Sequence, residues 1–129
     1  MELIAAAVAV RRHAHAPYSR FAVGAALRDE HGRIHAGCNV ENAAYPQGWC
    51  AEASAIAAMV AAGGRRIAEL VVAGPGPRPC TPYGGCRQKI REFASPDLVI
   101  RMVDEHGAVL LTRTLGALLP DSFGSEHLA

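Results

Sequence analysis

Hydrophobic residues fall into two kinds of segment along this chain, long alanine-rich stretches and short apolar runs bounded by glycine or proline. The long stretches cover residues 2–14 and 50–62 and have few polar interruptions, so they predict helices. Pro17 closes the first stretch, and Gly63-Gly64 closes the second as a typical C-terminal stop. Shorter helical patterns follow over residues 86–93 and 115–119.

The short apolar runs predict five strands, over residues 21–27, 33–38, 70–73, 98–103 and 108–113. The first two and the last two flank the same tetrapeptide, Asp-Glu-His-Gly, whose glycine can supply a positive φ, so two hairpins are expected. Residues 70–73 are wholly apolar, which is typical of a strand buried on both faces. Residues 39–49 and 74–85 are expected to be loops.

The resulting order, α-β-β-α-β-α-β-β-α, predicts a mixed sheet covered by helices, an α/β sandwich. The chain has 129 residues, enough for one domain spanning 1–129 and too few for two. Half of the residues are hydrophobic, so a sizeable core is possible.

Charge and hydropathy exclude several classes of partner. The formal net charge is +1 with no basic stripe or acidic tail, so we expect no nucleic-acid and no membrane partner. The apolar N-terminal run resembles a signal peptide, but Glu2 replaces the positive start and Arg11 and Arg12 lie on the wrong side of the run. We therefore expect a cytoplasmic protein.

Cysteine usage points to chemistry. The four cysteines are Cys38, Cys50, Cys80 and Cys86. Without a secretory signal and with a full-sized core, metal binding or catalysis is expected rather than disulfides. None of the six histidines has a ligand spacing, so we expect them at the surface.

The segment Cys50-Ala51-Glu52, read with Pro82 and Cys86, carries the main signal. Zinc deaminases have a first ligand, a small residue and a glutamate, followed later by Pro-Cys-x-x-Cys. A helix that starts near each cysteine would favour a thiolate through its N–H groups and dipole. Taken alone, Cys50 could equally be a buried small hydrophobe and Glu52 a first-turn residue that complements the dipole.

From about residue 17 to 128, the sequence resembles the small cytidine deaminases of pyrimidine salvage. The resemblance rests on ordered segments, PYSRFAVGAA at 17–26, GCNVENA at 37–43, YP at 45–46, CAE at 50–52, CRQ at 86–88, REF at 91–93 and LLPDSFG at 118–124. It implies a three-layer α/β/α sandwich with a mixed five-stranded sheet, and a hydrolase with zinc as cofactor.

The resemblance also implies roles at the reaction centre. Cys50 and Cys86 resemble the zinc ligands. Glu52 resembles the proton shuttle between zinc-activated water, the pyrimidine N3 and the leaving amine. The backbone around Ala51 and Thr81 is similar to the part of the family's pocket that reads the edge of the base.

Further positions resemble the residues that hold the nucleoside. Asn39 and Glu41 resemble the ribose-binding pair, whose amide and carboxylate suit hydroxyl groups. Phe21 resembles the ring that packs on the base, although alternation with Val23 alone would place it in the core. Tyr45 and Phe123 resemble residues that complete a neighbouring subunit's pocket, which implies a homotetramer.

Two positions depart from the family pattern. Tyr83 stands where the family has its second ligand cysteine, and Ala53 stands where many members have an arginine. Three thiolates around Zn²⁺ would carry a charge of −1 that the arginine offsets, whereas two thiolates and a neutral tyrosine sum to zero. Tyr83, Cys80 or water could complete the zinc site, and an empty site is also open.

The expected activity is zinc-dependent hydrolytic deamination of cytidine or deoxycytidine to uridine or deoxyuridine and ammonia. One alternative is deamination of a modified cytosine nucleoside, as in the nucleoside-antibiotic (blasticidin-type) deaminases. Another is a metal-free, inactive homologue that binds nucleosides or serves only as a subunit, for which Tyr83 is the reason.

Overall fold

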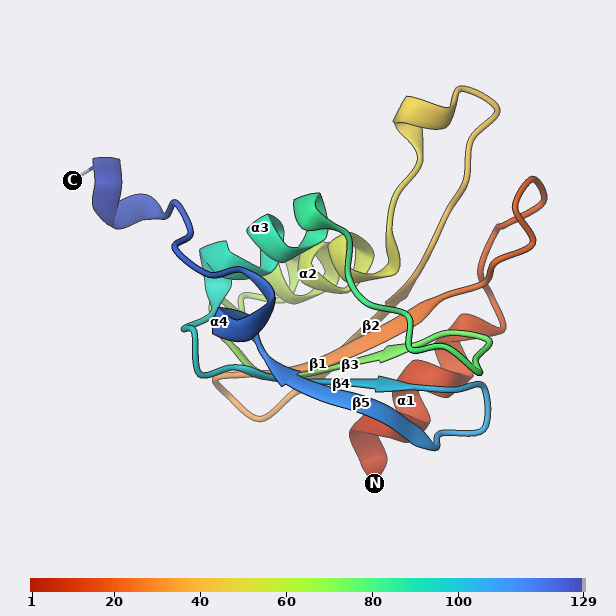
Figure 1. Cartoon of the computed structure of the whole chain (residues 1–129), viewed down its shortest axis with the longest axis horizontal. Helices are drawn as coiled ribbons and strands as arrows, with labels where there is room; N and C mark the ends of the chain where they lie inside the picture. Colours follow the sequence, from red (N-terminus) through yellow and green to blue (C-terminus); the bar gives the residue numbers. More distant parts are fainter. Residues whose placement is uncertain (129) are drawn as a thin grey trace.

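A computed structural model describes residues 1–128 of the chain, and a five-stranded sheet runs through its centre (Figure 1). The strands are β1 (Gly24–Asp29), β2 (Ile34–Cys38), β3 (Ile67–Ala73), β4 (Val99–Val103) and β5 (Val109–Thr114), in the order β2-β1-β3-β4-β5. Strands β3 and β4 pair in parallel and all other neighbours pair antiparallel, so the sheet is mixed as predicted.

Helices cover both faces of the sheet and give the predicted three-layer α/β/α arrangement. Helix α1 (Glu2–Arg11) packs on β1, β2 and β3 from one side, and α2 (Ala51–Ala61) and α3 (Gly84–Phe93) lie on the other side (Figure 1). Shorter elements are η1 (Tyr45–Gln47), α4 (Leu115–Leu118) and η2 (Ser125–Leu128). Among residues 1–128, no helix has the length and apolar character needed to cross a membrane.

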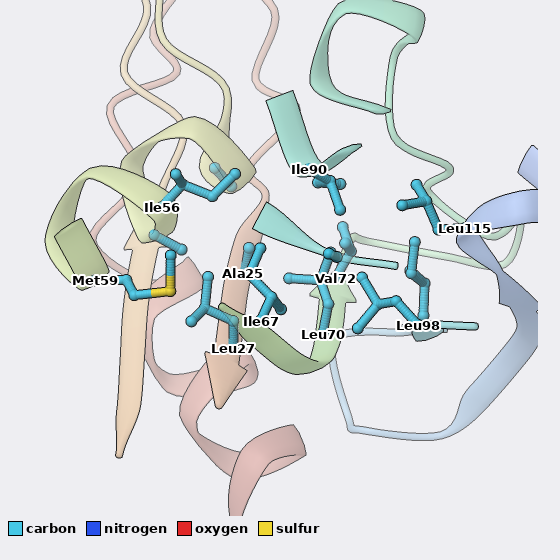
Figure 2. Close-up of a cluster of buried hydrophobic side chains, with 14 of the residues drawn as sticks. Ala25, Leu27, Ile56, Met59, Ile67, Leu70, Val72, Ile90, Leu98 and Leu115 are labelled. Carbon is cyan, nitrogen blue, oxygen red and sulfur yellow. The ribbon is translucent and has the colours of Figure 1, made fainter. Parts of the chain in front are cut away.

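Strand β3 is buried on both faces because alternate side chains enter two different hydrophobic clusters. Leu70 and Val72 pack toward α2 and α3 with Met59 and other core residues (Figure 2). Val71 and Ala73 pack toward α1, where they join Leu3 in a second cluster. Burying one such aliphatic side chain contributes about 1.5–3 kcal/mol, so the apolar part of β3, residues 70–73, stabilises all three layers at once.

Helix α2 approaches the sheet closely at Gly37 of β2. A Cβ atom at Gly37 would lie 2.5 Å from the backbone nitrogen of Ala55 and 2.6 Å from Cβ of Ser54. Only glycine fits this contact, because neither a helix backbone nor a strand backbone can give way by the distance needed. The contact fixes the N-terminal half of α2, and therefore the residues at its start.

Element boundaries differ from the predictions at a few ends. The predicted strand over residues 21–27 begins only at Gly24, because the side chain of Asn39 bonds the backbone of Phe21 and Val23 in place of ladder partners. The predicted helix over residues 2–14 ends at Arg11, and the helix predicted to start at Cys86 begins two residues earlier.

Asp29 is a buried polar residue that the sequence analysis did not identify. It is 1% exposed and accepts hydrogen bonds from the N–H groups of His31 (2.8 Å) and Arg33 (3.0 Å) and from the Arg33 guanidinium (3.0 Å). Nε2 of His35 lies 2.8 Å from the same carboxylate, so the prediction that every histidine lies at the surface is wrong for His35. Burial alone would raise the pKa of Asp29, but the His35 contact, the two N–H donors and the Arg33 charge together lower it below its ordinary value.

We predict that Asp29→Asn makes the protein less stable at neutral pH and less sensitive to acid. Because the folded-state pKa of Asp29 is lowered, its contribution is present above about pH 4, the unfolded value, and is lost as pH falls toward the folded pKa. The melting temperature of Asp29→Asn should therefore fall by several degrees at pH 7, and the difference from the parent should shrink steadily as pH falls below about 4. Asp97→Asn, at an exposed turn, is the matched control. If the difference in melting temperature between the parent and Asp29→Asn were the same at every pH in this range, the assignment would be contradicted.

Candidate active site

One cavity of about 860 Å³ lies where the N-termini of α2 and α3 meet two long loops. The loop before α2 and the loop before β1 rise together from one end of the sheet (Figure 1), and hydrogen bonds join them. The lining includes Phe21, Asn39, Glu41, Tyr45, Cys50, Ala51, Glu52, Thr81, Tyr83 and Cys86. The structure thus brings together every predicted site residue except Phe123.

The two cysteines at the floor of this cavity occupy helix N-termini. Cys50 is the N-cap of α2, and its Sγ accepts a hydrogen bond from the N–H of Ala53 at 3.4 Å. Cys86 lies buried in the first turn of α3. Helix N-termini present free N–H groups and a partial positive charge, which favour thiolates over thiols. The Sγ atoms of both cysteines and a carboxylate oxygen of Glu52 lie within 4.8 Å of one another, a group that could hold a metal ion.

The structure joins Cys50 and Cys86 in a disulfide, where the sequence predicted two metal-binding thiolates. Their Cα atoms are 7.3 Å apart, beyond the 4.4–6.8 Å that is usual for disulfides. Two sulfurs bound to one tetrahedral zinc ion, each at about 2.3 Å, lie about 3.8 Å apart. The backbone separation therefore suits two ligands of a shared ion better than a covalent bridge.

Neither candidate for a third protein ligand joins this group in the described structure. Tyr83 is the N-cap of α3, and with 79% of its surface exposed it extends to the rim of the cavity rather than to its floor. Cys80 lines the cavity but lies outside the group of three residues. Burial, and then the nearby charge of Glu52, raise the pKa of Cys80 to about 11 against a smaller opposing effect of Arg11, so it is a neutral thiol at pH 7.

Glu52 is buried in the first turn of α2 beside the two cysteines. It is 4% exposed, and desolvation raises the pKa of its carboxyl above the ordinary value, against the opposing effects of its own backbone N–H and the charge of Lys89. A carboxyl group whose pKa is moved toward neutrality can both accept and release a proton near pH 7. This is the environment expected of a general acid and base.

Asn39 and Glu41 are held in fixed orientations by the loop before β1. Oδ1 of Asn39 accepts a hydrogen bond from the N–H of Val23 at 2.9 Å, and its Nδ2 donates to the carbonyl of Phe21 at 2.8 Å. The hydrogen bond from the Ser19 hydroxyl, and then those from the N–H groups of Ser19 and Tyr18, lower the pKa of Glu41, so it is ionised at neutral pH.

Aromatic side chains surround the cavity. Five of the seven aromatic residues line it, Tyr18, Phe21, Tyr45, Trp49 and Tyr83. Phe21 is 44% exposed, so it faces the cavity and does not join the core as alternation alone suggested. Tyr18 and Tyr45 meet edge to face with centroids 5.9 Å apart. Apolar walls with a few convergent polar groups suit a planar polar ring.

Phe123 is the predicted site residue that lies elsewhere. It belongs to the C-terminal segment, which extends away from the sheet (Figure 1), and its ring stacks on His127 with centroids 4.7 Å apart. Gln88 of α3 donates a hydrogen bond to its carbonyl at 2.9 Å, and 55% of Phe123 is exposed. Within one chain, Phe123 therefore does not contribute to this cavity.

Lys89 and Ser19 are among the cavity residues that received no role from the sequence. Lys89 lies three positions after Cys86 and so on the same face of α3, a spacing that could have indicated it. Ser19 gave no local signal, because its partner Glu41 lies 22 positions away.

Residues 1–102 match the family model described as the cytidine and deoxycytidylate deaminase zinc-binding region. This match covers most of the chain and includes both cysteines, Glu52 and the two polar loop residues. The chain belongs to this family.

Relatives of the deaminase match over nearly its whole length. A cytidine deaminase of Sporosarcina psychrophila is 40% identical over 128 residues, 99% of this chain and 93% of its own length. A cytidine deaminase of Mycobacterium tuberculosis is 41% identical over 115 residues, 89% of this chain and 82% of its own. The crystal structure of a cytidine deaminase from Burkholderia pseudomallei superposes with a TM-score of 0.88 at 44% identity and covers 95% of this chain and 97% of its own. The sheet and helices of this deaminase are therefore those of solved cytidine deaminases.

We predict that the two clustered cysteines, and neither of the other two, are needed to hold zinc in the reduced protein. Cys50→Ser or Cys86→Ser should weaken zinc binding more than about 100-fold. Changes to residues that only hydrogen-bond a metal ligand already weaken binding by about 10–100-fold, and loss of a ligand should cost more. Cys38→Ser is the matched control, and Cys80→Ser should behave like it. The measurement is zinc content by elemental analysis during competition with a chelator.

The same competition distinguishes the possible third ligands. Loss of zinc from Cys80→Ser would show that Cys80 moves in to complete the site. Tyr83→Cys should slow the loss of zinc to the chelator, because a thiolate binds zinc more strongly than a phenol.

Proposed function

We propose that this protein hydrolyses cytidine or deoxycytidine to uridine or deoxyuridine and ammonia, with zinc as its cofactor. The observation that carries the proposal is the burial of Glu52 beside Cys50 and Cys86, which lie at the N-termini of α2 and α3 on the floor of an aromatic cavity. Family membership and the names of relatives at 36–41% identity support the same activity.

Cys50 and Cys86 would hold the zinc ion, and their chemistry fits it. Thiolates are preferred zinc ligands, and catalytic sites of this metal keep one position open for water or substrate. When bound, zinc lowers the pKa of a water ligand to about 7 and so supplies hydroxide at neutral pH. Tyr83 is one candidate for the remaining ligand position. Because its side chain is largely exposed, water is the favoured ligand there.

Glu52 would manage the protons of the reaction. As the water oxygen bonds to C4 of the cytosine ring, Glu52 takes one proton from that water and delivers it to N3. It then takes the second proton from the new hydroxyl group and delivers it to the amino group, and the bond between C4 and the amine breaks to release ammonia. One carboxyl group can perform both transfers because its raised pKa lets it alternate between the two states.

The remaining cavity residues would hold the nucleoside. The ring of Phe21 would pack on the base, and the backbone at Ala51 and Thr81 would read the base's edge. One N–H of the Asn39 side chain has no partner within residues 1–128 and can donate to a ribose hydroxyl group, and the ionised Glu41 can accept a hydrogen bond from one. This pair favours a plain cytosine nucleoside over a free base.

The active unit is proposed to be a homotetramer in which neighbours complete each pocket. Phe123 lies outside its own chain's cavity, on an exposed segment that extends away from the sheet. Tyr45 lines its own cavity and is also largely exposed. Exposed aromatic side chains such as these favour burial against another chain.

We predict that Glu52→Gln lowers kcat for cytidine by 10²- to 10⁴-fold, because the amide keeps the shape but cannot carry the proton. Turnover is measured by loss of cytidine absorbance at equal zinc content. Glu92→Gln, on an exposed position of α3, is the matched control. A loss of less than about tenfold would remove Glu52 from the proton path. An inactive parent that holds zinc would contradict the proposed activity, and a parent that binds nucleoside without zinc would favour the metal-free alternative.

We predict that the protein scatters light as a tetramer and that Phe123→Ala raises KM for cytidine at least about fivefold. The expected size of the effect reflects the loss of one base-stacking aromatic contact, about 1–3 kcal/mol. Mixing Phe123→Ala with Glu52→Gln should restore part of the activity, because each subunit then supplies what the other lacks. A fully active monomer would return Phe123 to an intrachain role.

A further inference from the structure

The hydroxyl group of Ser19 lies between two residues of the proposed nucleoside site. It donates a hydrogen bond to Oε2 of Glu41 and accepts one from the N–H of Phe21 at 3.0 Å. All three residues line the same cavity. A single hydroxyl group thus links the carboxylate proposed to bind the ribose to the residue proposed to pack on the base.

Ser19 completes the set of donors that orient Glu41. Oε1 accepts from the N–H groups of Tyr18 (3.0 Å) and Ser19 (3.1 Å), and Oε2 accepts from the Ser19 hydroxyl. A carboxylate has about four acceptor positions, so three are used within the chain and about one remains for a ligand. Without the hydroxyl donor, Oε2 would lose its fixed partner and the carboxylate could rotate.

The backbone next to Ser19 is also constrained. Arg20 has a φ of +59°, in the left-handed region that is uncommon for residues other than glycine. Such conformations persist where the surroundings hold them, and they are frequent at ligand sites. Here the bonds from residues 18 and 19 to Glu41 hold the turn on one side, and the N–H of Arg20 donates to the carbonyl of Ala16 at 2.9 Å on the other.

We propose that Ser19 is a positioning residue for nucleoside recognition, whose hydroxyl group fixes the Glu41 carboxylate for the ribose. This inference rests on the proposed function, since it assigns the same cavity to a nucleoside. Ser19 acts through Glu41 and need not touch the reacting atoms.

The effect of Ser19 falls on the site rather than on the fold. Ser19 is exposed and belongs to neither hydrophobic cluster, so removal of its Oγ leaves the core intact. The backbone donors to Oε1 of Glu41 also remain. The expected loss is therefore partial and specific to ligands that carry a ribose.

The test compares Ser19→Ala, Ser19→Thr and Ser95→Ala. Ser95 is an exposed serine in the turn after α3 and serves as the matched control. Calorimetric dissociation constants are measured for uridine and uracil, and kcat and KM for cytidine. Ser19→Ala should weaken uridine binding and raise KM about tenfold, with uracil binding and melting temperature unchanged, because loss of one hydrogen bond to a charged group has about this effect. Ser19→Thr, which keeps the hydroxyl, should behave like the parent.

A double-mutant cycle with Glu41→Gln identifies the route of the effect. If Ser19 acts through Glu41, Ser19→Ala should add less than about twofold to the loss that Glu41→Gln already causes. Equal losses for uridine and uracil, no rescue by threonine, or full additivity would each overturn the inference. A parent that binds uridine but does not turn over cytidine would contradict the proposed activity and leave the Ser19 test intact. A parent that neither binds nor turns over a nucleoside would overturn both.

Discussion

The burial of β3 on both faces is the constraint on which the rest of this structure depends. Its alternate side chains anchor α1 on one side and α2 and α3 on the other, so a seven-residue strand determines the order of the layers. Because α2 and α3 share one face and both begin at the same end of the sheet, their N-termini converge. The floor of the cavity is therefore a consequence of packing. Cys50 and Cys86 lie at the positive ends of the two helix dipoles because Cys50 is the N-cap of α2 and Cys86 lies in the first turn of α3.

Electrostatics at this floor depend on the same convergence. Two helix N-termini stabilise negative charge, and Lys89 adds a full positive charge at the rim. Burial has the opposite effect on Glu52, whose pKa it raises. In the reduced protein, the N–H of Ala53 would stabilise negative charge on Cys50, while burial favours the protonated form of Glu52 within 4.8 Å of it.

Local pattern was sufficient to predict the fold. Alanine-rich and apolar runs predicted every main helix and all five strands, because period and turn chemistry are properties of neighbouring residues. Contacts between distant residues were not predictable in this way. The sequence could not show that Asn39 would replace the ladder partners of Phe21 and Val23, or that His35 would lie against buried Asp29.

In the candidate site, too, local patterns were predictable from the sequence and the placement of side chains by distant contacts was not. Spacing and resemblance indicated Cys50, Glu52 and Cys86, and the structure gathers all three. The orientation of Tyr83 toward solvent could not be read from its position in the chain, because it depends on how the loop over residues 74–83 enters α3. Nor could the sequence place Phe123 outside its own chain's cavity.

The contact at Gly37 has a consequence for how loss-of-function variants of this protein would be interpreted. Any side chain at this position would push α2 away from β2, and the displaced end of the helix carries Cys50 and Glu52. Gly37 does not line the cavity and has no chemistry of its own. In a genetic screen scored by growth, a change there would be grouped with catalytic mutations, and only its effect on metal retention and folding would separate the two classes.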